Sequence, residues 1–355
     1  MNLKSSVQAP DVTIRKVKIG SILLESGKQL DDVELAYESA GSTTGPVILV
    51  CHALTGSQYA VGTEKEPGWW AGLIGSGQYV DTSRYRVLTF NVLGGCSGST
   101  GPRSVCKKSG QTYRADFPHI SVRDMVRAQK KALEVLGISE LFAVMGGSLG
   151  GMQVFEWGVM YPSFMKKLFV FASSPYLSDY GIAFNRIGIT AICNDPAFNG
   201  GDYTEGAVLK GLEIARMAGL VTYRTPALFD GRFRREEADD GERPYYQVES
   251  YLNYQGEKLA KRFDANSYLS LLYAMNAHDI GAGRGGWEQA SNTIQAEFYA
   301  FGFEGDLLYD PDVLRACAST VKSGHYFHVE TLFGHDGFLT EYDRWGGYVS
   351  EALEN

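Results

Sequence analysis

The sequence predicts an α/β protein with a mostly parallel β-sheet, helices on both faces of that sheet, and a helical segment inserted between two parts of it. Three observations predict this fold. Buried strand patterns alternate with helix patterns from residue 45 to 175. The strand patterns are missing from about 179 to 292 and return between 296 and 330. Alternating β and α elements are typical of parallel sheets whose two faces are covered by helices.

Short apolar, β-branched runs bounded by turns predict the first strands of the sheet. Between them, one segment with helical spacing ends at Gly137, where a glycine commonly ends a helix, and a second helix ends at Pro162. In chain order, the predicted elements are a strand at 47–52, a strand at 86–94, a helix at 121–137, a strand at 141–145 that turns into a helix, and a strand at 166–173.

The pattern changes in the second half of the chain. Residues 179–292 contain amphipathic helical stretches joined by charged or tyrosine-rich connections, without a buried strand pattern. Strands are predicted again at 296–303 and 324–330, followed by a last helix near the C-terminus. We therefore expect a core domain formed by residues 1–178 and 293–355, and a helical lid formed by the residues between them.

Charge and cysteine content argue against several classes of protein. The 355 residues include 33 Lys or Arg and 41 Asp or Glu, a formal charge of −8, and they form no basic stripe for nucleic acid. No stretch reaches the ~18 apolar residues of a membrane span, and the N-terminus lacks the apolar core of a signal peptide. The five cysteines have no CxxC spacing, which indicates neither a disulfide framework nor a zinc site. We expect a cytoplasmic protein without a bound metal that binds neither nucleic acid nor membrane.

The strongest motif is GGSLG at residues 146–150, which fits the pattern G-x-S-x-G. It lies where a predicted strand becomes a helix, and this is the position of a nucleophile elbow. Glycines are needed there because the turn is strained and a Cβ atom would clash. Ser148 would expose its hydroxyl at the N-terminus of the helix, an end that favours developing negative charge. We therefore predict that Ser148 is a catalytic nucleophile.

A serine nucleophile needs a base and an acid that orients the base, and in this architecture the acid and then the histidine follow the serine. His335 stands in a glycine-flanked loop between the last strand and the last helix. Asp306 follows the preceding strand, and the next two residues, Leu307 and Leu308, could bury and orient it. We predict a triad of Ser148, Asp306 and His335, in which Asp306 holds His335 in the right tautomer. The other candidates for the base and the acid are expected to be structural or surface residues. They are the histidines His278, His325 and His328 and the acids Glu304, Asp310 and Asp312.

An oxyanion hole needs two backbone N–H groups aimed at the developing negative charge. One belongs to the residue after the nucleophile, Leu149, and the other to a loop after an earlier strand. The sequence HALTGS at 52–57 forms that loop, and Leu54 is the predicted donor. His52 is expected to shape the loop rather than to transfer protons.

Several motifs occur along nearly the whole chain, from about residue 12 to 355. They include HALTGS (52–57), GWW (68–70), NVLGGCSGSTGP (91–102), GGSLGGMQ (146–153), GLEIARMAGLVTYR (211–224), RFDANSYL (262–269) and GHDGFL (334–339). In these motifs and their order, the chain resembles the homoserine O-acetyltransferases, which are acyltransferases with the α/β-hydrolase fold.

The resemblance implies the same triad and adds residues for the substrate. It implies that Arg216 holds the carboxylate of an amino acid, for which a forked guanidinium is suited. Tyr223 would line the same pocket, and Asp336 would receive the ammonium group. The implied reaction moves an acetyl group from acetyl-CoA to the hydroxyl of L-homoserine, in methionine biosynthesis, through an acyl-serine and without a bound cofactor. Family members are homodimers through their lid helices, so a homodimer is expected.

Other functions remain open at this point. Close relatives use succinyl-CoA as the donor or L-serine as the acceptor, and a difference of a few atoms in the pocket decides between them. A serine ester hydrolase would use water as the acceptor, although it would have no use for a pair of charges that binds a zwitterion. A binding module without catalysis is a further alternative, which the intact triad disfavours.

Overall fold

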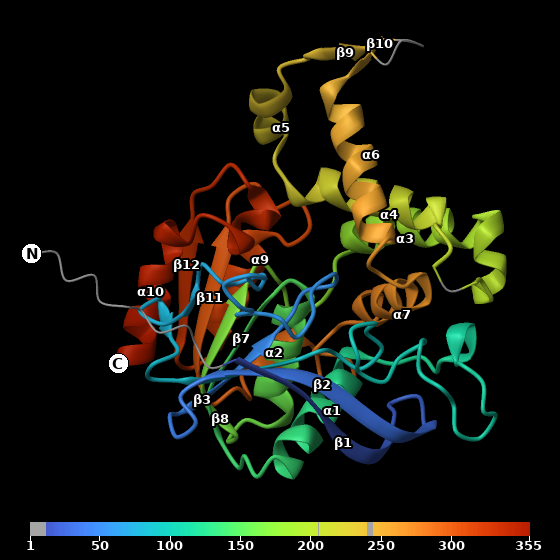
Figure 1. Ribbon diagram of the computed structural model, residues 1–355. Coiled ribbons are helices and arrows are strands. Elements are labelled where there is room, and N and C mark those ends of the chain that lie inside the picture. Colours follow the sequence, from blue (N-terminus) through green and yellow to red (C-terminus); the bar gives the residue numbers. More distant parts are fainter. Residues whose placement is uncertain (1–11, 205, 240–243) are drawn as a thin grey trace, which may run out of the picture.

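The computed structural model describes residues 12–204, 206–239 and 244–355, and its central feature is an eight-stranded sheet (Figure 1). The strand order is β1-β2-β6-β3-β7-β8-β11-β12. The strands from β6 to β12 are parallel, and β1 and β2 join antiparallel at one edge. The predicted α/β fold with a mostly parallel sheet is confirmed. Residues 1–11, with which the predicted core domain begins, lie outside the described residues.

The six strands predicted from buried apolar runs are all present. The sheet consists of β1 (Val12–Leu23), β2 (Gln29–Gly41), β3 (Val47–Cys51), β6 (Arg86–Phe90), β7 (Leu141–Gly147), β8 (Met165–Phe171), β11 (Glu297–Phe303) and β12 (Gly324–Val329), and a small separate pair is formed by β4 (Ile74–Gly75) and β5 (Val80–Asp81). The sequence patterns did not predict β1 and β2, because exposed charged residues interrupt the apolar alternation of these strands.

Helices cover both faces of the sheet and bury two hydrophobic clusters. On one face pack α1 (Val122–Val135), α2 (Leu149–Met160) and α9 (Pro311–Thr320). On the other face, α10 (Tyr342–Glu354) packs with the segment around Trp70. Parallel sheets are covered on both faces in this way. Helix α1 begins with a capping box at Ser121, which fixes the start of the helix predicted there.

Between β8 and β11 the described chain is mostly helical. Its helices are α3 (Asp179–Cys193), α4 (Lys210–Tyr223), α5 (Pro226–Phe233), α6 (Gln247–Ala260), α7 (Ala265–Asn276) and α8 (Trp287–Ser291). No buried strand was expected in this segment, and the short hairpin of β9 (Glu237–Asp239) and β10 (Pro244–Tyr246), which lies between α5 and α6, has no buried residue in either strand. In Figure 1 the hairpin and α6 extend away from the rest of the molecule. The division of the chain into a core and a lid stays a prediction.

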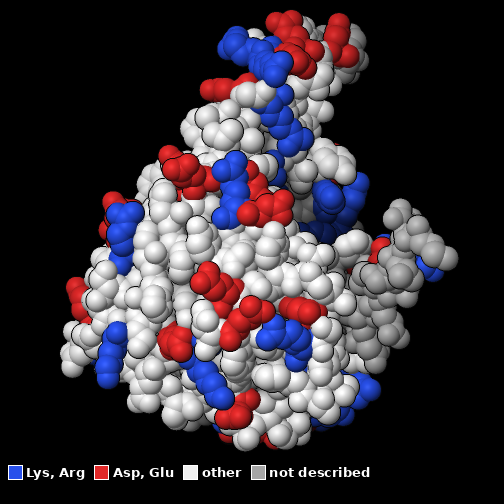
Figure 2. All heavy atoms as spheres, turned by 90° about the vertical axis from the view of Figure 1, so that its left-hand side faces the viewer, with Lys and Arg blue, Asp and Glu red and all other residues white. Residues whose placement is uncertain are grey.

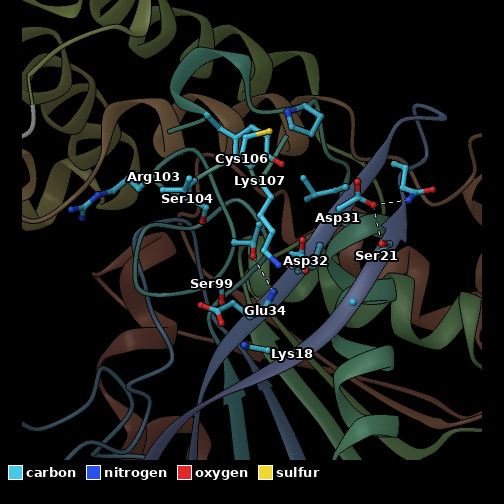
Figure 3. Close-up of a pocket in the computed structure, with 18 of the residues that line it drawn as sticks. Lys18, Ser21, Asp31, Asp32, Glu34, Ser99, Arg103, Ser104, Cys106 and Lys107 are labelled. Atoms are coloured by element: carbon cyan, nitrogen blue, oxygen red, sulfur yellow. Dashed lines mark hydrogen bonds and ion pairs between the residues drawn. The ribbon is translucent and has the colours of Figure 1, made fainter. Parts of the chain in front are cut away.

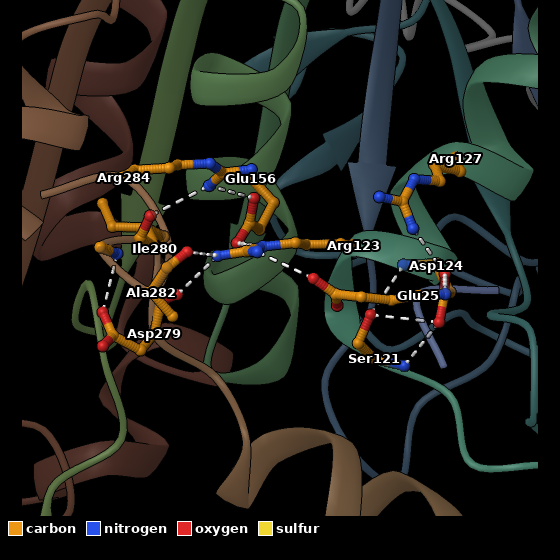
Figure 4. A network of polar contacts seen from close by, with 11 residues as sticks. Glu25, Ser121, Arg123, Asp124, Arg127, Glu156, Asp279, Ile280, Ala282 and Arg284 are labelled. Carbon is orange, nitrogen blue, oxygen red and sulfur yellow. Dashed lines mark hydrogen bonds and ion pairs between the residues drawn. The ribbon is translucent and has the colours of Figure 1, made fainter. Parts of the chain in front are cut away.

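Arg123 on α1 ties the end of this helical segment to the core (Figure 4). Its Nε donates to Oε1 of Glu156 on α2 at 2.9 Å, and another of its nitrogens donates to the carbonyls of Asp279 and Ala282. Arg284 donates to the second oxygen of Glu156 at 2.8 Å. The Glu156 side chain is buried and its two oxygens are shared by two guanidinium groups. This network holds the chain between α7 and α8 beside α2.

The surface charges are mixed in sign. On the face shown in Figure 2, Lys and Arg side chains are interspersed with Asp and Glu. Within the described ranges, no helix is both long enough and apolar enough to cross a membrane. In the same part of the chain, no group of three or more His, Cys, Asp or Glu side chains is placed to hold a metal ion.

Candidate active site

Ser148 stands at the sharp turn between β7 and α2. Its φ is 57° and its ψ is −125°, a conformation that residues with a side chain seldom adopt. A Cβ on Gly146 would lie 2.6 Å from the backbone of Gly150, and one on Gly150 would lie 2.1 Å from the carbonyl oxygen of Cys51. Glycine is therefore required on both sides of the serine, and the turn has the form of a nucleophile elbow.

His335 and Asp306 are joined by a hydrogen bond of 2.9 Å between Nδ1 and Oδ2. They lie in the loops that follow the carboxyl ends of β12 and β11. The other oxygen of Asp306 accepts the backbone N–H groups of Leu308 at 2.9 Å and Tyr309 at 3.1 Å. Backbone amides thus orient the carboxylate, whereas Leu307, expected to help bury it, is 40% exposed.

The charges around His335 favour its protonated form. Burial has the largest effect on the pKa of His335 and by itself would lower it. The charge of Asp306, the hydrogen bond to Asp306 and the charge of Asp336 act the other way, and together they raise the pKa above its ordinary value. A base with this environment can hold the proton that it takes from a nucleophile.

The serine and histidine loops are neighbours in the structure. Phe338 packs against the elbow, where a Cβ on Gly147 would come within 2.4 Å of its ring, and it meets His335 edge-on with ring centroids 5.4 Å apart. Ser148 and His335 are not hydrogen-bonded to each other. Such bonds are often long in free enzymes and tighten when substrate binds. The structure thus brings the three predicted triad residues into one site.

Two backbone amides are available beside Ser148. Neither the N–H of Leu54 nor that of Leu149 donates to an acceptor among the described residues. Leu149 is the first residue of α2, where N–H groups have no partner within the helix. The side chain of Leu54 lines the same cavity as Ser148. Both predicted oxyanion donors are therefore free and close to the serine.

His52, beside this loop, is buried and holds the backbone together. Its Nε2 accepts the N–H of Val92 at 3.0 Å, and its Nδ1 lies 2.7 Å from the carbonyl of Ala53. Burial lowers the pKa of His52 to about 4, so the ring stays neutral at neutral pH. These contacts confirm the structural role predicted for His52.

A small cavity of about 40 Å³ opens at Ser148 and is covered by α3, α4 and α7. Tyr223, at the end of α4, lines it, and its ring lies 5.5 Å from that of His335. Arg216, two turns earlier on α4, places its guanidinium carbon 5.6 Å from the Tyr223 ring. Burial raises the pKa of Tyr223 most, while the charge of Arg216 lowers it and the charge of Asp336 raises it. Of the three residues assigned to substrate binding, Tyr223 lines the cavity and Arg216 lies against its ring.

The sequence patterns missed two residues of this site. Arg224 donates its Nε–H to Oδ2 of Asp336 at 2.9 Å, so this carboxylate already has a cationic partner. Tyr309 stacks on His335, with ring centroids 5.2 Å apart and planes 27° apart. Arg224 directly follows Tyr223, and Tyr309 comes three residues after Asp306, so proximity in sequence was the one signal that could have found them.

A much larger hollow than this cavity does not contain the predicted site. A groove of about 1280 Å³ lies between the β1–β2 hairpin and the loop at 95–108 (Figure 3), and no predicted site residue lines it. Lysines of the groove are paired with acids: Lys107 with Asp32 at 2.6 Å, and Lys108 with Asp31 at 3.1 Å. Lys18 and Lys28 also line the groove, and the smaller cavity is the better candidate because it contains Ser148.

Comparisons with known proteins agree with this geometry. Residues 46–342 match the protein family described as alpha/beta hydrolase fold. The chain is 44% identical to a homoserine O-acetyltransferase of Symbiobacterium thermophilum, over 90% of this chain and 88% of that protein. The solved structure of a homoserine O-acetyltransferase from Bacillus anthracis covers 97% of this chain and 98% of its own, with a TM-score of 0.91 and 26% identity. The structure of esterase E22 is also similar, with a TM-score of 0.88, 27% identity, and coverage of 96% of this chain and 100% of its own.

Proposed function

The chain belongs to the homoserine O-acetyltransferase family, which has the α/β-hydrolase fold, and from this premise we propose that it acetylates the side-chain hydroxyl of L-homoserine. The acetyl group would come from acetyl-CoA, a co-substrate rather than a bound cofactor. The product would be O-acetyl-L-homoserine, an intermediate of methionine biosynthesis. The single observation that carries this proposal is the position of Arg216, whose guanidinium carbon lies 5.6 Å from the ring of Tyr223, a residue that lines the cavity at Ser148.

In the first half-reaction, His335 takes the proton of the Ser148 hydroxyl, and Oγ attacks the thioester carbon. A bond forms between Oγ and carbon, and the carbonyl oxygen becomes an oxyanion held by the N–H groups of Leu54 and Leu149. The carbon–sulfur bond then breaks, and the thiol of CoA leaves with the proton from His335. Asp306 stabilises the imidazolium that exists between these steps, in agreement with the raised pKa of His335.

In the second half-reaction, the hydroxyl of homoserine takes the place of the thiol. His335 accepts its proton, the hydroxyl oxygen attacks the acetyl carbon, and the bond to Ser148 breaks as His335 returns the proton to Oγ. Water could attack in the same way. The cover of α3, α4 and α7 over the small cavity supports a role in limiting water and positioning the acceptor.

The acceptor's carboxylate has a cationic site available. Arg216 forms no ion pair with a carboxylate among the described residues. A second arginine, Arg262, lies close by: burial lowers its pKa most, and the charge of Arg216 lowers it further. An anion beside these two guanidinium groups would offset the effect of Arg216 on Arg262. This arrangement supports a substrate with a carboxylate at the Arg216 end.

The lining of the cavity favours an acetyl donor over a succinyl donor. Of the residues that line it, all of them in the described part of the chain, none is charged. A succinyl group would carry a second carboxylate into this space, where desolvation of an unpaired charge is costly. The few non-hydrogen atoms of an acetyl group meet no such cost.

The esterase alternative is kept because esterase E22 shares the fold at 27% identity. An ester hydrolase needs the serine, the histidine and the oxyanion donors but no charges for an amino acid. Arg216, which lies against Tyr223 at the cavity, and Asp336, which is held by Arg224, favour the transferase.

Release of CoA thiol, followed with a thiol-reactive dye, tests the proposal. Acetyl-CoA and succinyl-CoA are each offered alone, with L-homoserine, and with L-serine. Release from acetyl-CoA that depends on homoserine and disappears in Ser148→Ala is the expected result. Faster release with succinyl-CoA or with serine would contradict the proposed substrates. It would not contradict acyl transfer through Ser148. Release at the same rate without any amino acid would identify water as the acceptor.

The quaternary structure and location belong to the same proposal. Helix α5 has no buried residue, and α6 buries only Gly256 and Leu259, so these helices have surface available for a second copy of the chain. We expect a homodimer in the cytoplasm. Sedimentation equilibrium of the purified protein measures its oligomeric state. A dominant monomer at micromolar concentration would contradict the homodimer.

A further inference from the structure

Tyr309 has a hydroxyl group that the proposed mechanism does not use. Its side chain is only 3% exposed, and its hydroxyl is one of the few buried polar atoms of the described residues without a hydrogen-bond partner. Buried polar groups are nearly always paired, and an unpaired one lowers stability. An exception inside a reaction site therefore calls for a function.

Tyr309 is held in place by two residues of the predicted triad, Asp306 and His335. Its backbone N–H donates to Oδ1 of Asp306 at 3.1 Å, and its ring stacks on His335 with centroids 5.2 Å apart. The hydroxyl has no hydrogen-bond partner, and Ser148 is among the groups that act on the pKa of Tyr309. Tyr309 thus lies against Asp306 and His335, with a free hydroxyl on the side of Ser148.

The two tyrosines that line the cavity, Tyr223 and Tyr268, are in a different situation. The hydroxyls of Tyr223 and Tyr268 contact each other, and both also feel the charge of Arg216. They are suited to the acceptor's pocket. Of these three tyrosines, Tyr309 is the one whose hydroxyl is buried without a hydrogen-bond partner.

We propose that Tyr309 is a further catalytic residue, whose hydroxyl donates a hydrogen bond to Oγ of Ser148 while that oxygen gains negative charge. This inference rests on the proposed function of Ser148 as the nucleophile. When Oγ loses its proton to His335 and attacks, the Tyr309 O–H group shares the developing charge. When the acyl–oxygen bond breaks in the second half-reaction, the same hydrogen bond stabilises the departing Oγ. Tyr309 keeps its own proton throughout, so the proton balance between Ser148, His335 and the substrates is unchanged.

The surroundings keep the phenol in the form that donates. Burial raises the pKa of Tyr309 most, the contact with Ser148 opposes this effect, and the charges of Asp306 and Tyr223 raise the pKa further. The hydroxyl is therefore neutral at neutral pH. A donor that is already in place and has no other partner needs no rearrangement when charge develops.

Tyr309→Phe tests the inference, because it removes the hydroxyl and keeps the ring that stacks on His335. Two rates are measured: labelling of Ser148 by a fluorophosphonate, which needs no particular acceptor, and thiol release with acetyl-CoA and homoserine. We expect kcat and the labelling rate to fall about 10- to 100-fold, with little change in KM. The midpoint of thermal unfolding should stay the same or rise, since an unpaired buried hydroxyl is removed.

The matched control is Tyr85→Phe. The Tyr85 hydroxyl is buried but donates to the carbonyl of Leu353 at 2.9 Å, far from the triad in the fold. This variant should lower the unfolding midpoint and leave both rates unchanged. Tyr309→Leu, which also removes the ring, should lower stability as well as rate.

Each failure has a distinct meaning. Wild-type rates in Tyr309→Phe would overturn the inference and leave the nucleophile in place. A rate loss accompanied by a stability loss equal to that of Tyr309→Leu would overturn it too, because packing would then explain the effect. Absence of labelling in the wild-type protein, or labelling that persists in Ser148→Ala, would overturn the proposed nucleophile and with it the inference.

Discussion

The guanidinium of Arg224 donates its Nε–H to Oδ2 of Asp336 at 2.9 Å, and this ion pair joins the end of α4 to the loop that carries His335. Arg224 also donates to the hydroxyl of Tyr251 on α6. The carboxylate proposed to receive the substrate's ammonium group is therefore oriented before substrate arrives. It also lies close enough to His335 for its charge to raise the pKa of the imidazole.

Changes at this ion pair should shift the pH profile in opposite directions. The reaction needs neutral His335, so the rate falls as pH drops through the raised pKa of His335. Asp336→Asn removes a negative charge that raises this pKa, and the acidic limb should move to lower pH. Arg224→Leu leaves Asp336 without its cation, and the limb should move to higher pH. Fluorophosphonate labelling across pH 5 to 9 measures both shifts without an acceptor, and equal shifts of the same sign would contradict this electrostatic account.

Asp306→Asn should have the largest effect on the base. Asp306 supplies the main opposition to the burial that would lower the pKa of His335. The variant should lose about 10⁴-fold in kcat, and the remaining activity should have its acidic limb at lower pH. Asp310→Asn is the control: its carboxylate caps α9 by accepting the N–H of Asp312, and this variant should keep the wild-type rate and profile. A small effect at Asp306 with a large one at Asp310 would show that the acid had been wrongly assigned.

Arg216→Ala should impair the second half-reaction and spare the first. We expect a rise of about 10- to 100-fold in KM for homoserine, because a charged hydrogen bond to the carboxylate is lost, while acetylation of Ser148 keeps its rate. With 3-aminopropan-1-ol, which lacks the carboxylate, the variant and the wild type should perform alike. Arg186→Ala, an exposed arginine on α3, serves as the control. A similar loss with both acceptors would mean that Arg216 supports the fold of the pocket rather than the carboxylate.

Local sequence patterns predicted those features of the fold and site that depend on neighbours in the chain. The elbow at Ser148 was predictable because strand, glycines and helix adjoin one another, and Asp306 and His335 were predictable because parallel strands bring the ends of β11 and β12 to the same edge of the sheet. The partner of Asp336 was not predictable, since Arg224 precedes it by 112 residues and reaches it only through the packing of α4. The missing partner of the Tyr309 hydroxyl is likewise a property of the packed site. Strand β1 was not predicted from the sequence because its charged residues face solvent and its stability comes from pairing with β2.

Glu156 should be the most sensitive of the charged residues outside the site. Its side chain is 1% exposed, and it accepts hydrogen bonds from Arg123 and Arg284, which are 16% and 25% exposed. Glu156→Gln keeps the size of the side chain but leaves Arg284 without its carboxylate partner and Arg123 with Glu25 alone. Breaking a buried pair in this way costs about 3–5 kcal/mol of unfolding free energy, which urea unfolding measures.

Glu354→Gln is the control, because Glu354 pairs with Arg84 where both side chains are more than half exposed, and such pairs contribute little. High salt should leave the difference between the two variants nearly unchanged, since buried charges are poorly screened; a loss at Glu156 as small as that at Glu354 would mean that water already solvates the network.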